Sequence, residues 1–521
     1  IIMIIGELLF LTISYIWYKL SDVTAEKLAA FYQKYKCHIF LGIGILAYIC
    51  YFTTISFLRY QNFFTGRFDL GNMDQTVWNT LHGRIFELTN PNGTNIMSRL
   101  AFHADFILIL LAPFYLIWQD PQMLLLIQTV ILACGAIFVF LIAKNIIQNK
   151  NIALAFSFAY LINPSINHTN LFDFHPVALA TTFLLAAWYF LQNKKMLLFL
   201  FFLLLAALTK EEAWLIAGFF GVYIFFWKKK RIFGITLTTV SLALFYLLIW
   251  KIIPTFLGTQ HFALSYYADF GSTPSGIVKG LIFSPLKIIS TILQKKQLTY
   301  LFELFFPLGF LSLLFPFALL FALPDLAINI LSNDGQLHEI YFHYASTITP
   351  FLFVSAAYAV VRIKKIFPAC INAVFITLIM TTSILSAYFF GPLPGARYAN
   401  ISVFTQSLPI RNEVSQFLSS IPRKYSVAAT NNIGSHLSHR QFIYTIPLGV
   451  DKADIIVMLL NDPFAQPTLA AQISLANKLD NDKNYIKIFE HEPFVVFKKK
   501  NIPTYVKRKS KNILPLFKGT Q

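Results

Sequence analysis

Charged residues are scarce in this sequence, and cysteines are scarcer still. Charged side chains make up 13% of the 521 residues against 56% hydrophobic ones, and the mean hydropathy is +0.61. Soluble domains carry about twice that share of charge, so a soluble globular protein is excluded. The four cysteines form no CxxC pair, which argues against a disulfide framework or a zinc–thiolate site. No basic face is interleaved with exposed aromatic residues, so nucleic acid is not an expected partner.

Apolar runs of roughly 17 to 25 residues recur along most of the chain, as membrane-spanning helices require. They predict an all-α polytopic membrane bundle of about 11–12 transmembrane helices in the cell (cytoplasmic) membrane. The segment 104–118 is apolar but short and contains Pro113, so we expect it to lie in the membrane interface. The segment 1–18 lacks a basic start and a cleavage site, and is expected to be a retained helix. The expected spans are 1–18, 37–57, 122–143, 152–162, 177–191, 196–208, 214–227, 232–253, 298–314, 315–331, 345–361 and 368–390.

Basic clusters between these runs predict the orientation of the bundle. Lys194 and Lys195, the run 228–231 and the run 362–365 each follow an apolar segment. Because Lys and Arg are retained on the cytoplasmic side, the polar loops 58–120, 163–176, 254–297 and 332–344 are expected on the outer face. Residues 1–36 form an expected N-terminal helix and linker, and 37–390 the transmembrane domain. The basic tail 501–521 would contact anionic lipid headgroups or be disordered.

The composition changes after residue 390. The Gly- and Pro-rich stretch 391–395 predicts a linker. Beyond it the pattern predicts a helix at 413–420 and strands at 425–430, 442–445, 455–460, 485–489 and 494–498, the last two forming a hairpin. Residues 391–500 are therefore an expected small α/β domain on the outer side.

Polar groups concentrate in the first expected outer loop. The stretch runs Phe68-Asp-Leu-Gly-Asn-Met-Asp-Gln, continues through Trp78 and Asn79, and ends at His82-Gly-Arg84. A polar cluster beside a membrane span is a default functional-site hypothesis. A solvated loop whose acids cap a short helix is the structural alternative.

Four further polar clusters are expected on the same face. Three of these clusters also have a structural interpretation. Asp173-Phe-His175 would cap the helix that begins at Pro176. Lys210-Glu211-Glu212 would be a solvated turn, and His343 an interfacial aromatic partner. Taken together, the loops carry the side chains needed to activate a hydroxyl and to neutralise a phosphate. A carboxylate deprotonates a hydroxyl or holds a divalent metal (Mg, Mn or Zn) with an imidazole, and a lysine or arginine neutralises a phosphate. The clusters are 103–105, 163–176, 210–212 and 334–344.

These motifs, with Tyr341-Phe-His-Tyr344 and the stretch 429–440, resemble a widespread prokaryotic family of predicted membrane proteins of unknown function, over about Leu58 to Phe497. More distantly, the layout is similar to the GT-C superfamily of integral-membrane glycosyltransferases. That resemblance rests on Asp69 in the first outer loop, Gly83 a short helix later, the segment 104–118 and Asp173 in the second outer loop. His103-Ala-Asp105 and the lack of a second acid next to Asp69 depart from the superfamily pattern.

The GT-C resemblance implies a glycosyltransferase that moves a hexosyl or pentosyl group from a polyprenyl-phosphate donor to an unknown acceptor on the outer face. Membrane lipids would be further partners. The expected catalytic residues are Asp69 (general base or metal ligand), Asp74 and Asp173. The expected metal ligands are Asp69, Asp173 and His175, and the expected substrate-binding residues are Arg84, His103, His175, Lys210, Glu211 and His343. The stretch 429–440 would bind a phosphate or glycan, or supply turn chemistry. Two alternatives stay open: a transporter or lipid flippase, and a non-catalytic envelope assembly protein.

Overall fold

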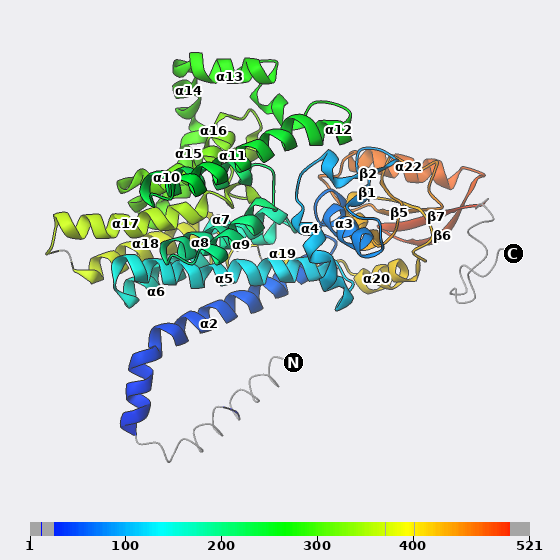
Figure 1. The fold of residues 1–521 in the computed structure, drawn as a ribbon. Helices are drawn as coiled ribbons and strands as arrows, with labels where there is room; N and C mark the ends of the chain where they lie inside the picture. Colours follow the sequence, from blue (N-terminus) through cyan, green and yellow to red (C-terminus); the bar gives the residue numbers. More distant parts are fainter. Residues whose placement is uncertain (1–11, 13–24, 370, 401, 501–521) are drawn as a thin grey trace.

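The computed structural model describes residues 12, 25–369, 371–400 and 402–500. A helical bundle forms one end of the molecule and a five-stranded sheet the other (Figure 1). Apart from residue 12, the expected span 1–18 lies outside the described residues, as does the basic tail 501–521.

The bundle helices follow the long apolar runs. Their ends carry ordinary signals: Asn149 caps α6 by accepting from the N–H groups of Asn151 and Ile152, and Pro176 occupies the first turn of α8. Trp188 of α8 is buried among Phe220, Phe321 and Phe351. The bundle contains α2 (Ala25–Gln61), α5 (Gln122–Ile147), α6 (Lys150–Leu161), α8 (Pro176–Gln192), α9 (Met196–Ala207), α10 (Ala213–Trp227), α11 (Arg231–Leu247), α17 (Thr349–Ile366) and α18 (Asn372–Phe390).

Within the described part of the chain, four helices are long and apolar enough to cross a membrane: Phe31–Gln61, Gln122–Ile147, Arg231–Leu257 and Asn372–Phe390. A fifth span results if α13 (Pro274–Phe283) and α14 (Pro285–Ile292), which bend by 85°, count as one. Helices α8, α9 and α10 and the segment Ile107–Leu116 are apolar but shorter. The chain is therefore mostly helical with several apolar helices, while the number of 11–12 spans and their sidedness stay predictions.

The expected pair of long helices over 298–331 is wrong. Helix α15 (Lys295–Phe305) gives way to three 3-10 turns, and only α16 (Leu323–Leu331) is again α-helical. Pro307, Pro316 and Pro324 each stand in the first turn of a separate element, because proline cannot donate the hydrogen bond that a continuing helix needs. The turns are η7 (Phe306–Leu308), η8 (Leu311–Leu314) and η9 (Pro316–Phe321).

The loops beside the sheet domain are folded rather than irregular. The first begins with a single π-helical turn, η2 (Arg67–Gly71), which leads into α3 (Asn72–Leu81). A small antiparallel pair, β1 (Glu87–Thr89) and β2 (Ile96–Ser98), follows. The other short elements are η3 (Arg99–Ala101), α4 (Ile107–Leu111), η4 (Ala112–Leu116), α7 (Pro164–Leu171), η5 (Leu248–Ile252), α12 (Ile253–Leu257), η6 (Phe262–Tyr267), η10 (Gly335–His338) and η11 (His343–Ala345).

The C-terminal sheet has the order β4-β3-β5-β7-β6. Strand β3 is parallel to β4 and β5, whereas β7 runs antiparallel to β5 and to its hairpin partner β6. All five strands were predicted from the sequence, and α22, which contacts β6 and β7, was not. The strands are β3 (Val427–Ala429), β4 (Ile443–Thr445), β5 (Ile455–Leu459), β6 (Tyr485–His491) and β7 (Phe494–Lys499). The helices are α19 (Ser402–Thr405), α20 (Arg411–Ser420), α21 (Asn431–Gly434), η12 (Ser435–Leu437) and α22 (Leu469–Asp480).

The sheet domain is docked on the first loop by buried hydrogen bonds. The side-chain oxygen of Asn431 accepts from the N–H of Arg67, and the hydroxyls of Thr65 and Ser435 lie 2.8 Å apart. The amide of Gln75 donates to the carbonyl of Arg440 at 2.9 Å. The stretch 429–440, expected to bind a phosphate or glycan, thus supports the loop that carries Asp69.

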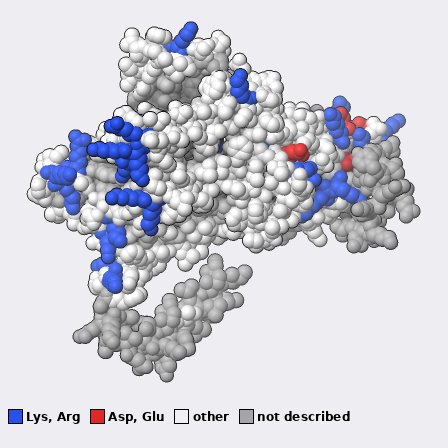
Figure 2. Space-filling view, in the orientation of Figure 1, with Lys and Arg blue, Asp and Glu red and all other residues white. Residues whose placement is uncertain are grey.

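Basic side chains gather at the opposite end of the molecule. Figure 2 shows Lys and Arg clustered where the bundle lies farthest from the sheet, with a broad band of uncharged surface between them and the C-terminal domain. The expected basic clusters lie at helix ends: Lys194 and Lys195 between α8 and α9, 228–231 between α10 and α11, and 362–365 at the end of α17.

Candidate functional site

A cavity of about 460 Å³ lies between the first loop and the bundle. That volume is typical of small-molecule sites. Six of the nine expected site residues line it, from four separate loops: Asp69, His103, His175, Lys210, Glu211 and His343. The remaining three, Asp74, Arg84 and Asp173, do not.

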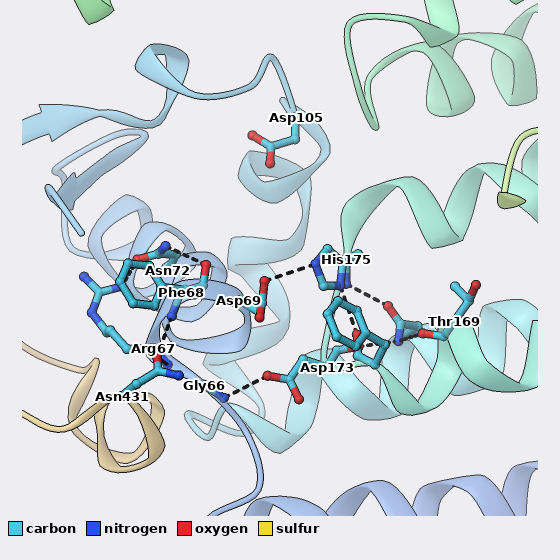
Figure 3. Close-up of polar contacts among 12 residues, drawn as sticks. Gly66, Arg67, Phe68, Asp69, Asn72, Asp105, Thr169, Asp173, His175 and Asn431 are labelled. Carbon is cyan, nitrogen blue, oxygen red and sulfur yellow. Dashed lines mark hydrogen bonds and ion pairs between the residues drawn. The ribbon is translucent and has the colours of Figure 1, made fainter. Parts of the chain in front are cut away.

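Asp69 and His175 point toward each other and are in contact (Figure 3). The π-helical turn η2 presents the Asp69 carboxylate, whose side chain is 39% exposed, and its Oδ1 lies 3.4 Å from Nε2 of His175. The His175 backbone N–H donates to Gln128, and its Nδ1 lies 3.0 Å from the carbonyl of Phe172. A carbonyl only accepts, so Nδ1 carries a proton. In the neutral ring, Nε2 therefore presents a lone pair to a carboxylate.

This pairing fits a bound cation. Two electron-pair donors 3.4 Å apart are stabilised by a positive charge between them or by a proton on His175. A histidine whose Nδ1–H is held by a backbone carbonyl is the usual arrangement of an Nε2 metal ligand. The predicted metal ligands Asp69 and His175 are thus suited to a divalent ion.

Asp173 lies behind this pair rather than in the cavity lining. Its Oδ2 accepts from the N–H of Gly66 at 2.9 Å, and its Oδ1 is 3.7 Å from Nη2 of Arg59. Burial raises the pKa of Asp173 to about 6, although the Arg59 charge opposes the shift. Because Gly66 precedes the π-helical turn, Asp173 anchors the backbone that carries Asp69.

The turn between α9 and α10 contributes one cation and two carboxylates. Lys210 Nζ lies 2.5 Å from Glu212 and 5.8 Å from the ring centre of Tyr344. Burial disfavours the ammonium, but Glu212 and Glu211 outweigh it and raise the pKa of Lys210 above its usual value. Lys210 is therefore charged at neutral pH.

Glu211 is held on the opposite side of that turn. Its carboxylate accepts from the N–H of Ala104 at 3.0 Å and lies 2.8 Å from Nδ1 of His103. Burial disfavours the anion, but the neighbouring His103 outweighs it and holds the pKa of Glu211 well below its usual range. His261 lies on the same carboxylate, and ligand atoms of the three side chains lie within 4.8 Å of one another. The three side chains therefore form one compact His/Glu group.

His343 completes the aromatic part of the lining. Its ring stacks on His175 with centres 3.9 Å apart. Burial lowers the pKa of His343 well below its usual value, and the nearby His175 and Lys210 act in the same direction. His343 is accordingly a neutral ring packed on His175.

Asp74 and Arg84 occupy other places. Asp74 is fully buried and accepts hydrogen bonds from the hydroxyls of Tyr115 and Ser438, with His439 Nε2 3.1 Å away. The Arg84 guanidinium donates to Asn79 at 2.9 Å and lies over the ring of Trp78. Asp74 therefore joins the loop to the sheet domain, and Arg84 is remote from the cavity lining.

Sequence reasoning missed several lining residues. Arg99 pairs with Asp105 through two nitrogens, with a shortest distance of 2.8 Å. His261 stands alone in a long loop with no pattern around it, whereas Asp325 is an acid inside an apolar run, a signal that sequence reasoning can use. Among the described lining residues, two cations (Arg99 and Lys210) face five carboxylates (Asp69, Asp105, Glu211, Glu212 and Asp325). The cavity lining therefore carries more carboxylates than cations.

Comparison with known proteins identifies the family. Residues 59–486 match the family described as "Predicted membrane protein (DUF2079)", and the chain belongs to it. No curated protein sequence matches the chain.

Solved structures similar to this chain include oligosaccharyltransferases of Archaeoglobus fulgidus. One, tethered to an acceptor peptide with an NVT sequon, is 14% identical, with 89% of this chain and 74% of that chain covered and a TM-score of 0.42. A second, AglB with an inhibitory peptide and a dolichol-phosphate, is 14% identical over 91% and 75%, with a TM-score of 0.40. A third, with Zn and sulfate, is 14% identical over 79% and 68%, with a TM-score of 0.37. TM-scores of this size do not establish a common fold, and the function proposed below rests on this chain's own residues.

Proposed function

We propose that this member of the DUF2079 family is a membrane glycosyltransferase of the GT-C kind. It transfers a hexosyl or pentosyl group from a polyprenyl-phosphate carrier to an acceptor hydroxyl at the outer face of the cytoplasmic membrane.

The observation that carries the proposal is that the cavity lining combines charged and apolar groups. It includes the carboxylates, imidazoles and ammonium described above. It also includes Phe245, Ile249 and Trp250 at the end of α11 and in η5, and the same stretch exposes large apolar residues such as Tyr246 and Leu247. A donor with a charged head and an isoprenoid tail matches both kinds of group.

The lining residues divide the chemistry between them. Lys210 is the lining ammonium that would neutralise a donor phosphate, exchanging part of its contact with Glu212 for the phosphate; Arg99 is paired with Asp105 through two nitrogens. A divalent ion held by Asp69 and His175 would supply additional charge neutralisation in this cavity. Asp173 and Gly66 keep the Asp69 turn in place. The sugar carbon would then lie among groups that favour departure of the phosphate.

The expected orientation follows from charge. The basic end of the bundle would face the cytoplasm, and the cavity, beside the sheet domain, would face outward. This is also the side on which a polyprenyl-linked sugar is consumed in the proposed reaction.

A transfer assay tests the proposal. The full chain is reconstituted in vesicles with a panel of hexosyl and pentosyl polyprenyl phosphates and candidate acceptors, and free polyprenyl phosphate is measured by mass spectrometry. We expect sugar-dependent release by the wild type. A protein that moves these lipids across the bilayer without releasing polyprenyl phosphate would instead be a flippase, and the proposal would fail.

A further inference from the structure

The carboxylate of Glu211 is contacted from two separate parts of the chain: His103 and Ala104 hydrogen-bond to it, and His261 Nε2 lies 3.5 Å away. His103 follows η3, Ala104 is its neighbour, and His261 precedes η6, about 50 residues after Glu211 in the sequence. Glu211 is 3% exposed and His261 is 4% exposed. This cluster forms one wall of the cavity.

The position of the proton on the His261 ring determines whether this histidine can bind a metal. The N–H of Ala263 donates to His261 Nδ1 at 3.1 Å, so Nδ1 presents a lone pair and the proton of the neutral ring is on Nε2. Nε2 lies 3.5 Å from Glu211 Oε1, too far for a good hydrogen bond, and has no hydrogen-bond partner among the described residues. A metal on Nε2 would require the proton on Nδ1, where the Ala263 N–H already points. His261 is therefore oriented as a proton donor to Glu211 and not as a metal ligand.

His103 is in the other tautomer from His261: its Nδ1 carries the proton and its Nε2 the lone pair. Its Nδ1 donates to the ionised Glu211 at 2.8 Å, which leaves the lone pair on Nε2, at the edge of the ring away from Glu211. The ring lines the cavity and its side chain is 26% exposed. A carboxylate that holds Nδ1–H orients the ring and stabilises the imidazolium formed when Nε2 takes a proton.

We propose that His103 is the proton acceptor of the transfer reaction and that Glu211 and His261 are its positioning residues. This assignment rests on the proposed function and frees Asp69 for cation binding. The acceptor oxygen forms a bond to the sugar carbon while the bond from that carbon to the phosphate oxygen breaks. The bonding electrons leave with the polyprenyl phosphate, and the hydroxyl proton moves to Nε2 of His103 before it passes to water.

Charged groups from several elements face His103. A base works best when its pKa is near the working pH, and imidazole is the side chain that meets this without large perturbation. Glu211 favours a positive charge on the His103 ring, Lys210 and the paired Arg99 oppose it, and His343 is a neutral neighbour. The groups that face His103 are Glu211, Lys210, His261, Arg99 with Asp105, and His343.

Chemical modification tests the pair without any substrate. Diethyl pyrocarbonate attacks the neutral imidazole, so the labelling of His103 between pH 5 and 8, read by peptide mass spectrometry, gives its titration midpoint. We expect Glu211→Gln to lower this midpoint by about one pH unit, because the stabilising charge is removed. His82, which is exposed and lies outside the cavity lining, is the control and should keep its midpoint.

Transfer kinetics test the catalytic role. We expect His103→Ala to lower kcat by about a hundredfold, with partial rescue by added imidazole, and His82→Ala to leave it unchanged. Glu211→Gln should move the acid limb of the pH profile downward together with the labelling midpoint.

Three results would decide against the pair: an unmoved midpoint in Glu211→Gln, wild-type kcat in His103→Ala, or zinc that co-purifies with the wild type and is lost in His261→Ala. If Glu211→Gln lowers the midpoint but the wild type transfers no sugar, the proposed function fails and the Glu211–His103 pair stands.

Discussion

Asn431 of the sheet domain accepts a hydrogen bond from the backbone N–H of Arg67 at 2.8 Å. The bond fixes the start of the π-helical turn two residues before Asp69, although the partners are 364 positions apart. A residue in the sheet domain therefore sets the position of the central carboxylate of the cavity.

Replacing Asn431 by alanine tests this dependence. Loss of the acceptor leaves a partly buried N–H unpaired, at a cost of about 1–3 kcal/mol. We expect Asn431→Ala to lower transfer about tenfold or more, since 1.4 kcal/mol already corresponds to a factor of ten. Asn477→Ala, at an exposed position of α22, is the matched control. Equal transfer by both variants would show that Asn431 of the sheet domain does not affect the activity of the site.

Asp69, Asp74 and Glu87 should respond differently to loss of charge. Asp69→Asn keeps the shape of a cavity-lining group but weakens cation binding, and should reduce transfer by about a hundredfold at normal membrane levels. Asp74→Asn places an amide among Tyr115, Ser438 and His439, and should lower the amount of folded protein more than the rate per molecule. Glu87→Gln, outside the cavity, should change neither. The measurements are complementation of a deletion strain and immunoblotting.

Bound metal should depend on Asp69 and His175. We expect a chelator to reduce transfer, and Asp69→Asn or His175→Ala to lower the divalent metal retained after dialysis by tenfold or more. His261→Ala should retain the wild-type amount. Elemental analysis of the reconstituted proteins measures the bound metal in all three variants. Full retention in both Asp69→Asn and His175→Ala would remove this pair as the metal site.

The sheet domain should lose stability in acid because of His436. This ring stacks on Tyr60 with centres 4.0 Å apart, and burial lowers its pKa to about 3. The unfolded chain binds the proton below about pH 6.5 and the folded chain does not, so stability is full above that pH and falls by up to about 1.4 kcal/mol per pH unit below it. His436→Phe keeps the stack and removes the titration. Thermal denaturation at pH 7.5 and 5 should show a smaller difference for the variant than for the wild type.

Orientation is tested by single cysteines at two exposed positions. In a background without the four natural cysteines, Asn92→Cys, in the loop between β1 and β2, should react with an impermeant maleimide from outside. Lys229→Cys, between α10 and α11, should react only after permeabilisation. The opposite pattern would turn the cavity toward the cytoplasm.

The sequence predicts the bundle helices and the sheet well because both have strong local signals. Helices α5 and α8 coincide with uninterrupted apolar runs, and the strands with short alternating or apolar stretches. The stretch 298–331 is equally apolar, but its prolines select 3-10 turns, which mean hydropathy does not reveal.

The site is predicted less completely because the direction in which a side chain points depends on the folded structure and not on its sequence neighbours. Asp69 and Asp74 belong to one motif, yet five residues along a helical path turn a side chain by about 140°, so one faces the cavity and the other the sheet domain. The role of His261 depends on a contact with Glu211 across about 50 positions, which no spacing rule indicates.

The burial of Asp74 against Ser438 has a consequence for the order of synthesis. The carboxylate leaves the ribosome 364 residues before its partner, which at about 5–20 residues per second is a delay of roughly 20 to 70 seconds. During that interval the first loop has no sheet domain to close on, and its acid stays hydrated. The loop that carries Asp69 and Asp74 is thus held in place only after the sheet domain has been synthesised, 364 residues later.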